Sequence, residues 1–281
     1  MSSRILTVEL VEELQQAVDA GVMIQQIVDS LKSATLPGVL EYGCAKWQRG
    51  SLPPLPKAIT QSPLGQSLNE VRSDLGIRTS GEQKQPPRSI SAQEQEFFVL
   101  EGNDPTVQQA WKEFLVRIQQ SGKAIGFSAD HAKGIAASLG EMADNAVVHS
   151  ESKQGVLVGY QAIEGAITCS VVDVGVGVLA SLRSNDAHND LSTHKDAIRR
   201  ALEQGVTRFG DGGGLGFYRV FKSLTAMWGT LRFRSGEGCV TMDGNDLNAD
   251  FGTDDFVLDR AGFQVTISCR VAESEPSHPL I

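Results

Sequence analysis

The chain has little of what a zinc site or a disulfide framework needs. Its 281 residues include four cysteines and five histidines, and no two cysteines form a C-x-x-C pair. This spacing excludes the common zinc-binding patterns. Cys169 and Cys269 lie in β-branched runs, and we expect them to be reduced core residues of a cytoplasmic protein, because disulfides are rare in that reducing compartment.

Long apolar runs and an excess of basic residues are also missing. No uninterrupted apolar segment approaches the roughly 20 residues that a membrane-spanning helix needs. The N-terminus shows no basic region followed by an apolar core, so we expect neither a membrane segment nor a signal peptide. The formal net charge of −9 argues against a broad surface for nucleic acid.

Two common nucleotide-binding motifs do not occur. The chain contains no G-x-x-x-x-G-K-[S/T], which would indicate a P-loop, and no G-x-G-x-x-G at the head of a strand-to-helix turn, which would indicate a Rossmann site. No period repeats along the chain either, which excludes a solenoid.

What the sequence does have is a stretch, residues 138–150, with two distinct helical faces. Glu141, Asn145 and His149 recur at every fourth residue, so an α-helix would place them on one face. A second stripe at helical spacing is apolar and consists of Ile135, Leu139, Met142 and Ala146. A half-buried helix whose polar side chains are merely solvated would give the same pattern, so this stretch alone does not identify a site.

Two glycine-rich stretches follow it. Residues 167–178 form a β-branched run that ends in Asp173, Gly175 and Gly177. Residues 210–217 read Gly-Asp-Gly-Gly-Gly-Leu-Gly-Phe and lead into an apolar segment. Each stretch alone would indicate no more than a turn. The three stretches together, in this order and roughly thirty to forty residues apart, indicate one composite site.

In this order the three stretches resemble the boxes of the GHKL superfamily, which includes gyrase B-type ATPases, the large heat-shock chaperones, histidine kinases and MutL. Residues 141–149 resemble the N box and residues 173–177 resemble the G1 box. The residues that match the G2 box are Gly212, Gly213, Gly214, Leu215 and Gly216. The resemblance covers roughly residues 105–272, and we identify no counterpart for residues 1 to about 100.

The resemblance implies a site for ATP and Mg²⁺. It makes Glu141 the general base that activates a water or a partner's hydroxyl. It makes Asn145 the ligand of Mg²⁺ through its side-chain oxygen, a hard ligand that suits this ion. His149 would either contact phosphate or support the site structurally, and both roles remain open. Asp173, at the end of a strand, would accept a hydrogen bond from the adenine amino group.

The glycines have separate implied roles. Gly175 and Gly177 would let the backbone pass close under the base, where a Cβ atom would intrude. The glycines of residues 212–216 would present backbone N–H groups to the phosphates at the N-terminus of a following helix. Residues 179–209 would form the lid, a loop and helix that close over the bound nucleotide.

Three functions are compatible with these boxes. The first is an ATPase that uses nucleotide-dependent lid closure to regulate a protein partner. The second is a protein serine kinase acting in trans, similar to bacterial anti-sigma-factor kinases, the stand-alone members that the chain resembles most. The third is a non-catalytic nucleotide-sensing module, against which the presence of Glu141 argues. The partner's identity and a homodimer stay open.

Two features of other family members are not expected here. No phosphoacceptor-histidine helix precedes the N box, which argues against an autophosphorylating histidine kinase. We also expect no second domain after residue 272 of the type that supplies a catalytic lysine in gyrase and MutL, which argues against a clamp mechanism.

The resemblance implies an α+β two-layer sandwich: a mixed, mostly antiparallel sheet with helices on one face, preceded by a smaller helical region. We expect a partner-binding region at residues 1–94, with a linker near residues 79–94. The ATP-binding domain would span residues 95–272, and residues 273–281 would form a flexible tail.

Individual elements follow from spacing and turn residues. The predicted helices span about residues 105–120, 128–149, 192–205 and 217–227. The predicted strands span residues 155–160, 166–172, 230–234, 239–242, 256–258 and 264–271, with a hairpin turn at Glu164-Gly165. Residues 4–33 predict two helices around Gly21, which we interpret as a packing hairpin and not as a DNA-binding pair, because neither helix is basic. The acidic residues 243–250 predict a solvated loop in place of a calcium site.

Overall fold

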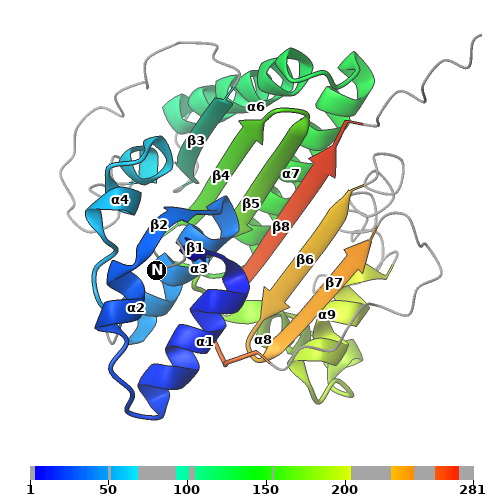
Figure 1. The fold of residues 1–281 in the computed structure, drawn as a ribbon. Coiled ribbons are helices and arrows are strands. Elements are labelled where there is room, and N and C mark those ends of the chain that lie inside the picture. The colour runs from blue at the N-terminus through cyan, green and yellow to red at the C-terminus, as the bar shows by residue number, and fades with distance from the viewer. Residues whose placement is uncertain are drawn as a thin grey trace, which may run out of the picture.

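The computed structural model describes residues 4–49, 52–68, 93–100, 105–153, 155–203, 229–243 and 257–271. Its central strands are β3 (Gln93–Leu100), β4 (Val156–Ile163), β5 (Ala166–Val172), β6 (Thr230–Ser235), β7 (Gly238–Asp243) and β8 (Phe263–Arg270). They form one six-stranded sheet in the order β3-β4-β5-β8-β6-β7, in which every neighbouring pair is antiparallel (Figure 1). The predicted α+β sandwich with a mostly antiparallel sheet is confirmed.

The hairpin of β4 and β5 forms where the sequence predicts it. Its turn residues Glu164 and Gly165 have φ angles of 23° and 71°, as a tight hairpin turn requires. The last strand, β8, inserts between β5 and β6, so that Val172 at the end of β5 pairs with Gln264 at the start of β8. This insertion brings the residues that follow β5 next to those that precede β8.

Among the described residues, three helices cover one face of the sheet: α6 (Pro105–Ala124), α7 (Ala129–His149) and α9 (His194–Leu202). As expected, Ser128 caps α7, since its side chain accepts a hydrogen bond from the backbone N–H of His131. The apolar stripe of α7 packs into the core as predicted, and its members are almost fully buried: Ile135, Leu139, Met142 and Ala146. The adjacent stripe of α7 is therefore left for the polar residues.

The described residues from 4 to 68, which we call the N-terminal unit, lie on the other face of the sheet (Figure 1). The unit contains β1 (Arg4–Leu6), α1 (Val8–Asp19), α2 (Gln25–Asp29), β2 (Leu31–Ala34), α3 (Leu36–Arg49) and α4 (Lys57–Thr60). The two helices predicted around Gly21 are present as α1 and α2, but this mostly helical region also contains a parallel pair of strands, β1 and β2, that the sequence did not predict. Strands of three and four residues carry too little periodicity to be recognised.

Alternate residues of the sheet belong to two different cores. Phe98 and Val171 pack into the core beneath α6 and α7, whereas Phe97 and Val172 pack against the N-terminal unit, including Leu36. This follows from the period of two along a β-strand. Part of the sheet is thus covered by helices on both faces. The predicted domain boundary at residue 94 falls inside β3.

Several smaller predictions have clear outcomes. β3 was not predicted, because its first half is a run of Gln and Glu. Val257 and Leu258, predicted as a strand, have no regular structure. The linker up to residue 92, the helix 217–227, the acidic loop from residue 244 and the tail 273–281 lie outside the described residues.

Cys169 and Cys269 are buried and unpaired, as expected. Among the described residues, no helix combines the length and apolar character needed to cross a membrane.

Candidate functional site

The polar face of α7 carries the three residues of the predicted N box. Glu141, Asn145 and His149 are each half-buried, in contrast to the fully buried apolar stripe beside them. The side-chain nitrogen of Asn145 is buried and has no hydrogen-bond partner within the described part of the chain. The pKa of the nearby Asp144 is raised, first by burial and then by the negative charge of Glu141. The Glu141 carboxylate and an Asn145 amide group whose nitrogen has no partner among the described residues therefore lie along one helix face.

Asp173 follows the last residue of β5 and is 3% exposed. Its Oδ1 atom accepts a hydrogen bond from the backbone N–H of Gly175 at 2.7 Å. Its Oδ2 atom is buried and has no hydrogen-bond partner among the described residues. Burial raises the pKa of Asp173 to about 7, although the hydrogen bond from Gly175 favours the charged form. Such an acceptor is costly to leave unpaired and is available to a ligand that donates a hydrogen bond.

The residues after Asp173 rest directly on the C-terminal end of α7. The backbone N–H of Val176 donates to the carbonyl oxygen of Ser150 at 2.8 Å. A Cβ atom at Gly175 would lie 1.8 Å from the same oxygen. We call residues 173–176 the Asp173 loop. This contact within the protein requires glycine at position 175. The close approach of Gly175 to a bound base stays a prediction.

The Asp173 loop is also held from the β6 side. Gly177, with φ of 76°, begins α8 (Gly177–Arg183), and the next residue, Val178, donates its N–H to Ser235 Oγ at 2.9 Å. The hydroxyl of Ser235 in turn donates to the carbonyl oxygen of Gly262 at 2.9 Å. A Cβ atom at Gly262 would lie 2.2 Å from the carbonyl oxygen of Asp173. The loop is therefore fixed by β6 and by the segment that leads into β8.

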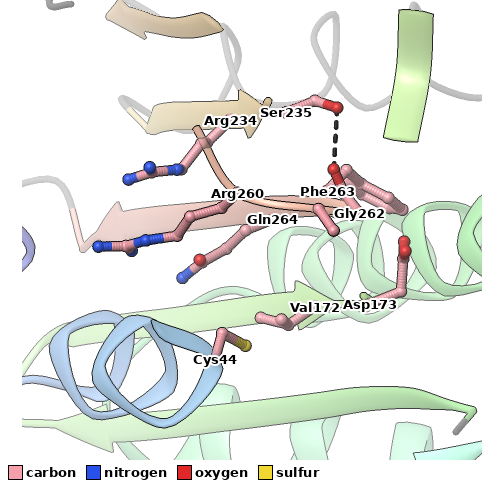
Figure 2. A pocket seen from close by; sticks show the side chains of 10 residues that line it. Cys44, Val172, Asp173, Arg234, Ser235, Arg260, Gly262, Phe263 and Gln264 are labelled. Atoms are coloured by element: carbon pink, nitrogen blue, oxygen red, sulfur yellow. Dashed lines mark hydrogen bonds between the residues drawn. The ribbon is translucent and has the colours of Figure 1, made fainter. Parts of the chain in front are cut away.

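A small pocket opens beside the loop (Figure 2). The pocket leaves room for about one water molecule and is too small for a nucleotide. Its lining residues are Cys44, Val172, Asp173, Arg234, Ser235, Arg260, Ala261, Gly262, Phe263 and Gln264. In Figure 2 the carboxylate of Asp173 lies apart from the guanidinium groups of Arg234 and Arg260. This arrangement leaves the Asp173 carboxylate without a cationic partner among the labelled side chains.

The two guanidinium groups instead belong to a buried charge cluster with the N-terminal unit. We define the charge cluster as Glu12 of α1, Glu41 of α3, Arg232 and Arg234 of β6, and Arg260. Glu41 is 0% exposed and pairs with Arg260 at 2.8 Å, with Arg234 at 3.2 Å, and with Arg232. Glu12 pairs with Arg234 and with Arg260. Burial opposes the charged form of Glu12, but the positive charges of Arg234 and Arg260 outweigh it and lower its pKa.

No residue of the charge cluster was singled out from the sequence. Glu12 and Glu41 lie on amphipathic helices, where a charged side chain usually faces solvent. One signal was present: Arg232 and Arg234 are two residues apart in a strand, so they share one face of the sheet. Two cations on one face of a strand with neighbours on both sides need buried acidic partners.

The part of the predicted lid that the structure describes packs against the rest of the protein. Residues 179–203 include most of α8, a short 3₁₀ helix (Asp186–His188) and α9. The inner face of α9 is buried at Ala197, Ile198 and Leu202, with Ile198 and Leu202 in the main core. Closure by this part of the lid would have to move these side chains out of contact with β6 and β7. Residues 204–209 lie outside the described chain.

The described residues include neither the predicted phosphate-binding glycines nor a cluster of metal ligands. Gly212, Gly213, Gly214, Leu215 and Gly216, the predicted phosphate-binding residues, lie outside the described residues. The described part of the chain contains no group of three or more His, Cys, Asp or Glu side chains that could hold a metal ion. A Mg²⁺ ion that takes one protein oxygen, phosphates and waters does not require such a group.

Comparisons with known proteins provide no family for the chain: no family model matches it, and no curated protein matches it. The GHKL assignment therefore remains a resemblance carried by the three boxes.

Proposed function

We propose that the protein binds ATP with Mg²⁺, hydrolyses it, and uses nucleotide-dependent lid closure to regulate a protein partner. The observation that carries the proposal is the buried Oδ2 of Asp173, which lacks a hydrogen-bond partner among the described residues. Adenine offers a matching donor in its exocyclic amino group. The bond between Val176 and Ser150 supports the proposal further, because it joins the Asp173 loop to the helix that carries Glu141 and Asn145.

In this proposal the residues of α7 act on the phosphates. Ser150 caps α7, and Asn145 lies five residues earlier, about 7.5 Å along the helix axis. The amide oxygen of Asn145 would hold Mg²⁺, which would neutralise phosphate charge when bound. Glu141 would accept a proton from the attacking water, while the bond from the γ-phosphorus to the bridging oxygen breaks and ADP and phosphate form. The G2 box would complete the site around the phosphates.

The test is Mg·ATP binding and turnover by the purified full chain and two variants. Glu141→Gln should keep binding and lose turnover, because the base is removed without a change in shape. Asp173→Asn should lose binding, because the carboxylate acceptor is replaced by an amide. Matched controls are Glu13→Gln on α1 and Asp29→Asn on α2, which make the same chemical changes at exposed positions.

The outcomes separate the three candidate functions. Turnover in the wild type that is lost in Glu141→Gln supports an ATPase. Binding without turnover supports a kinase acting in trans or a nucleotide sensor, and transfer of labelled phosphate to a serine-containing partner would then identify the kinase. If the wild type binds no ATP, the proposed function is wrong.

A further inference from the structure

Residues 257–263, which we call the connecting segment, are held by the N-terminal unit on one side. Three side chains of α1 and α3 contact this segment. Glu12 accepts a hydrogen bond from the N–H of Leu258 at 3.0 Å, and Glu41 pairs with Arg260 at 2.8 Å. Gln48 donates to the carbonyl oxygen of Ala261 at 3.1 Å. The N-terminal unit thus contacts consecutive parts of the connecting segment.

On its other side the connecting segment holds the Asp173 loop. The N–H of Asp173 donates to the carbonyl oxygen of Phe263 at 3.0 Å. Gly262 lies so close to the carbonyl of Asp173 that no side chain fits between them. The connecting segment also pairs with the β6–β7 turn, because Arg260 and Gly236 exchange backbone hydrogen bonds of 3.1 and 3.3 Å. A shift of Gly262 or Phe263 would therefore move Asp173.

We propose that Glu41 is a positioning residue of the nucleotide site: it holds Arg260 and thereby the connecting segment, which sets the position of Asp173. The inference rests on the proposed function and names how that site is regulated. Glu41 is the fully buried acidic member of the charge cluster, where two carboxylates face three guanidinium groups. If Glu41 loses its charge, one carboxylate, that of Glu12, faces the three buried guanidinium groups. This imbalance strongly favours displacement of Arg260 toward water.

This linkage makes the N-terminal unit a control element for nucleotide affinity. A protein partner that shifts α1 or α3 changes the contacts of Glu12, Glu41 and Gln48 with the connecting segment. Because coupling between two sites is reciprocal, bound nucleotide must change the affinity for that partner by the same factor.

The first test measures ADP affinity by calorimetry on the full chain. Glu41→Gln should weaken ADP binding by about fivefold to a hundredfold. The matched control is Glu96→Gln: Glu96 is 8% exposed and forms a bidentate pair with Arg117, but it lies on β3, at the far edge of the sheet. Glu96→Gln should leave ADP affinity unchanged. Equal losses of affinity in the two variants would overturn the inference, since they would show a general loss of stability.

A double-mutant cycle then tests whether Glu41 acts through Arg260. Glu41→Gln should weaken ADP binding much less when Arg260 is already changed to Gln, whereas Glu41→Gln and Glu96→Gln should be additive. Independent effects of Glu41→Gln and Arg260→Gln would contradict the proposed route. If Glu41→Gln does not fold, Glu12→Gln takes its place, because Glu12 contacts the same segment and is 12% exposed at its side chain.

A ligand-free measurement separates this inference from the proposed function. The N–H groups of Gly175, Val176 and Val178 are hydrogen-bonded, so their exchange with deuterium reports the order of the Asp173 loop. Glu41→Gln should accelerate this exchange in the absence of nucleotide, and Glu96→Gln should not. If the wild type binds no ADP, the proposed function fails while the exchange rates still decide the inference. Unchanged exchange in Glu41→Gln would overturn it.

Discussion

Val176 and Ser150 are joined by a backbone hydrogen bond of 2.8 Å, from the N–H of Val176 to the carbonyl oxygen of Ser150. The last carbonyl groups of a helix have no partner within the helix and need one from elsewhere. Here the residue after Gly175 supplies that partner. The bond joins α7, which carries the predicted N box, to the loop that carries the predicted G1 box, although the two are separate patterns in the sequence.

Gly175→Ala should destabilise the protein, because its Cβ atom would lie 1.8 Å from the carbonyl oxygen of Ser150 and 2.6 Å from the carbonyl carbon. We expect a loss of about 1–3 kcal/mol in the free energy of unfolding, as for other overpacked sites. Urea denaturation measures this loss. The control is Gly43→Ala in α3, where a Cβ atom meets nothing within 4 Å and should stabilise the helix by up to about 1 kcal/mol. An unchanged free energy of unfolding in Gly175→Ala would contradict the close contact.

The pKa of Asp173 predicts a pH-dependent stability. The folded protein keeps the Asp173 proton up to about pH 7, whereas the unfolded chain releases it near 3.8. The native state therefore binds more protons across this window, so the contribution of Asp173 to stability falls as pH rises from 3.8 to about 7 and is constant above it. Plots of the unfolding free energy against pH should therefore have different slopes for the wild type and Asp173→Asn across that window. Parallel curves would show that Asp173 titrates normally.

The buried acceptor on Asp173 predicts a preference for adenine over guanine. Above about pH 7, where Asp173 is ionised, an adenine amino group can donate to Oδ2, whereas the carbonyl oxygen of guanine would face the carboxylate as a second acceptor. We expect ATP to bind at least about a hundredfold more tightly than GTP, because an unpaired or repelled buried polar group is heavily penalised. Competition binding measures the ratio. A wild type with equal affinities for ATP and GTP would rule out this role for Asp173.

The packing of α9 predicts slow hydrogen exchange in part of the predicted lid. Ala197 and Ile198 are 0% exposed, and moving them would cost the free energy of core contacts. The amides of α9 should therefore be protected in the absence of nucleotide, to a degree comparable with β5. Rapid exchange of α9 that slows on addition of ATP would instead indicate that the whole of residues 179–203 moves as a lid.

The elements that the sequence predicts well are those with local signals. The β4–β5 hairpin has a period of two and a turn at Glu164-Gly165, and α7 has the Ser128 cap together with an uninterrupted apolar stripe. Asp173 was also identified from its place after a β-branched run. In each case the information lies within about twenty residues of sequence, which is the range over which periodicity and capping operate.

The missed features depend on contacts between distant parts of the chain. β1 and β2 are defined by their parallel pairing, and β3 by its pairing with β4. Glu41 and Arg260 are separated by 219 residues, and each alone resembles an ordinary solvated charge. The sequence therefore predicts the polar face of α7 and the position of Asp173, but not the charge cluster that supports the connecting segment.

The alternation of Phe97 and Phe98 along β3 has a consequence for how the protein can be divided. Each ring enters a different core, so β3 belongs equally to the N-terminal unit and to the sheet domain. A fragment beginning at residue 95 would start within β3 and leave Phe97 and Val172 without the apolar side chains of the N-terminal unit. The two regions should therefore melt in one cooperative transition, and dissecting the chain at the predicted boundary would produce an aggregation-prone fragment with an uncovered apolar sheet face.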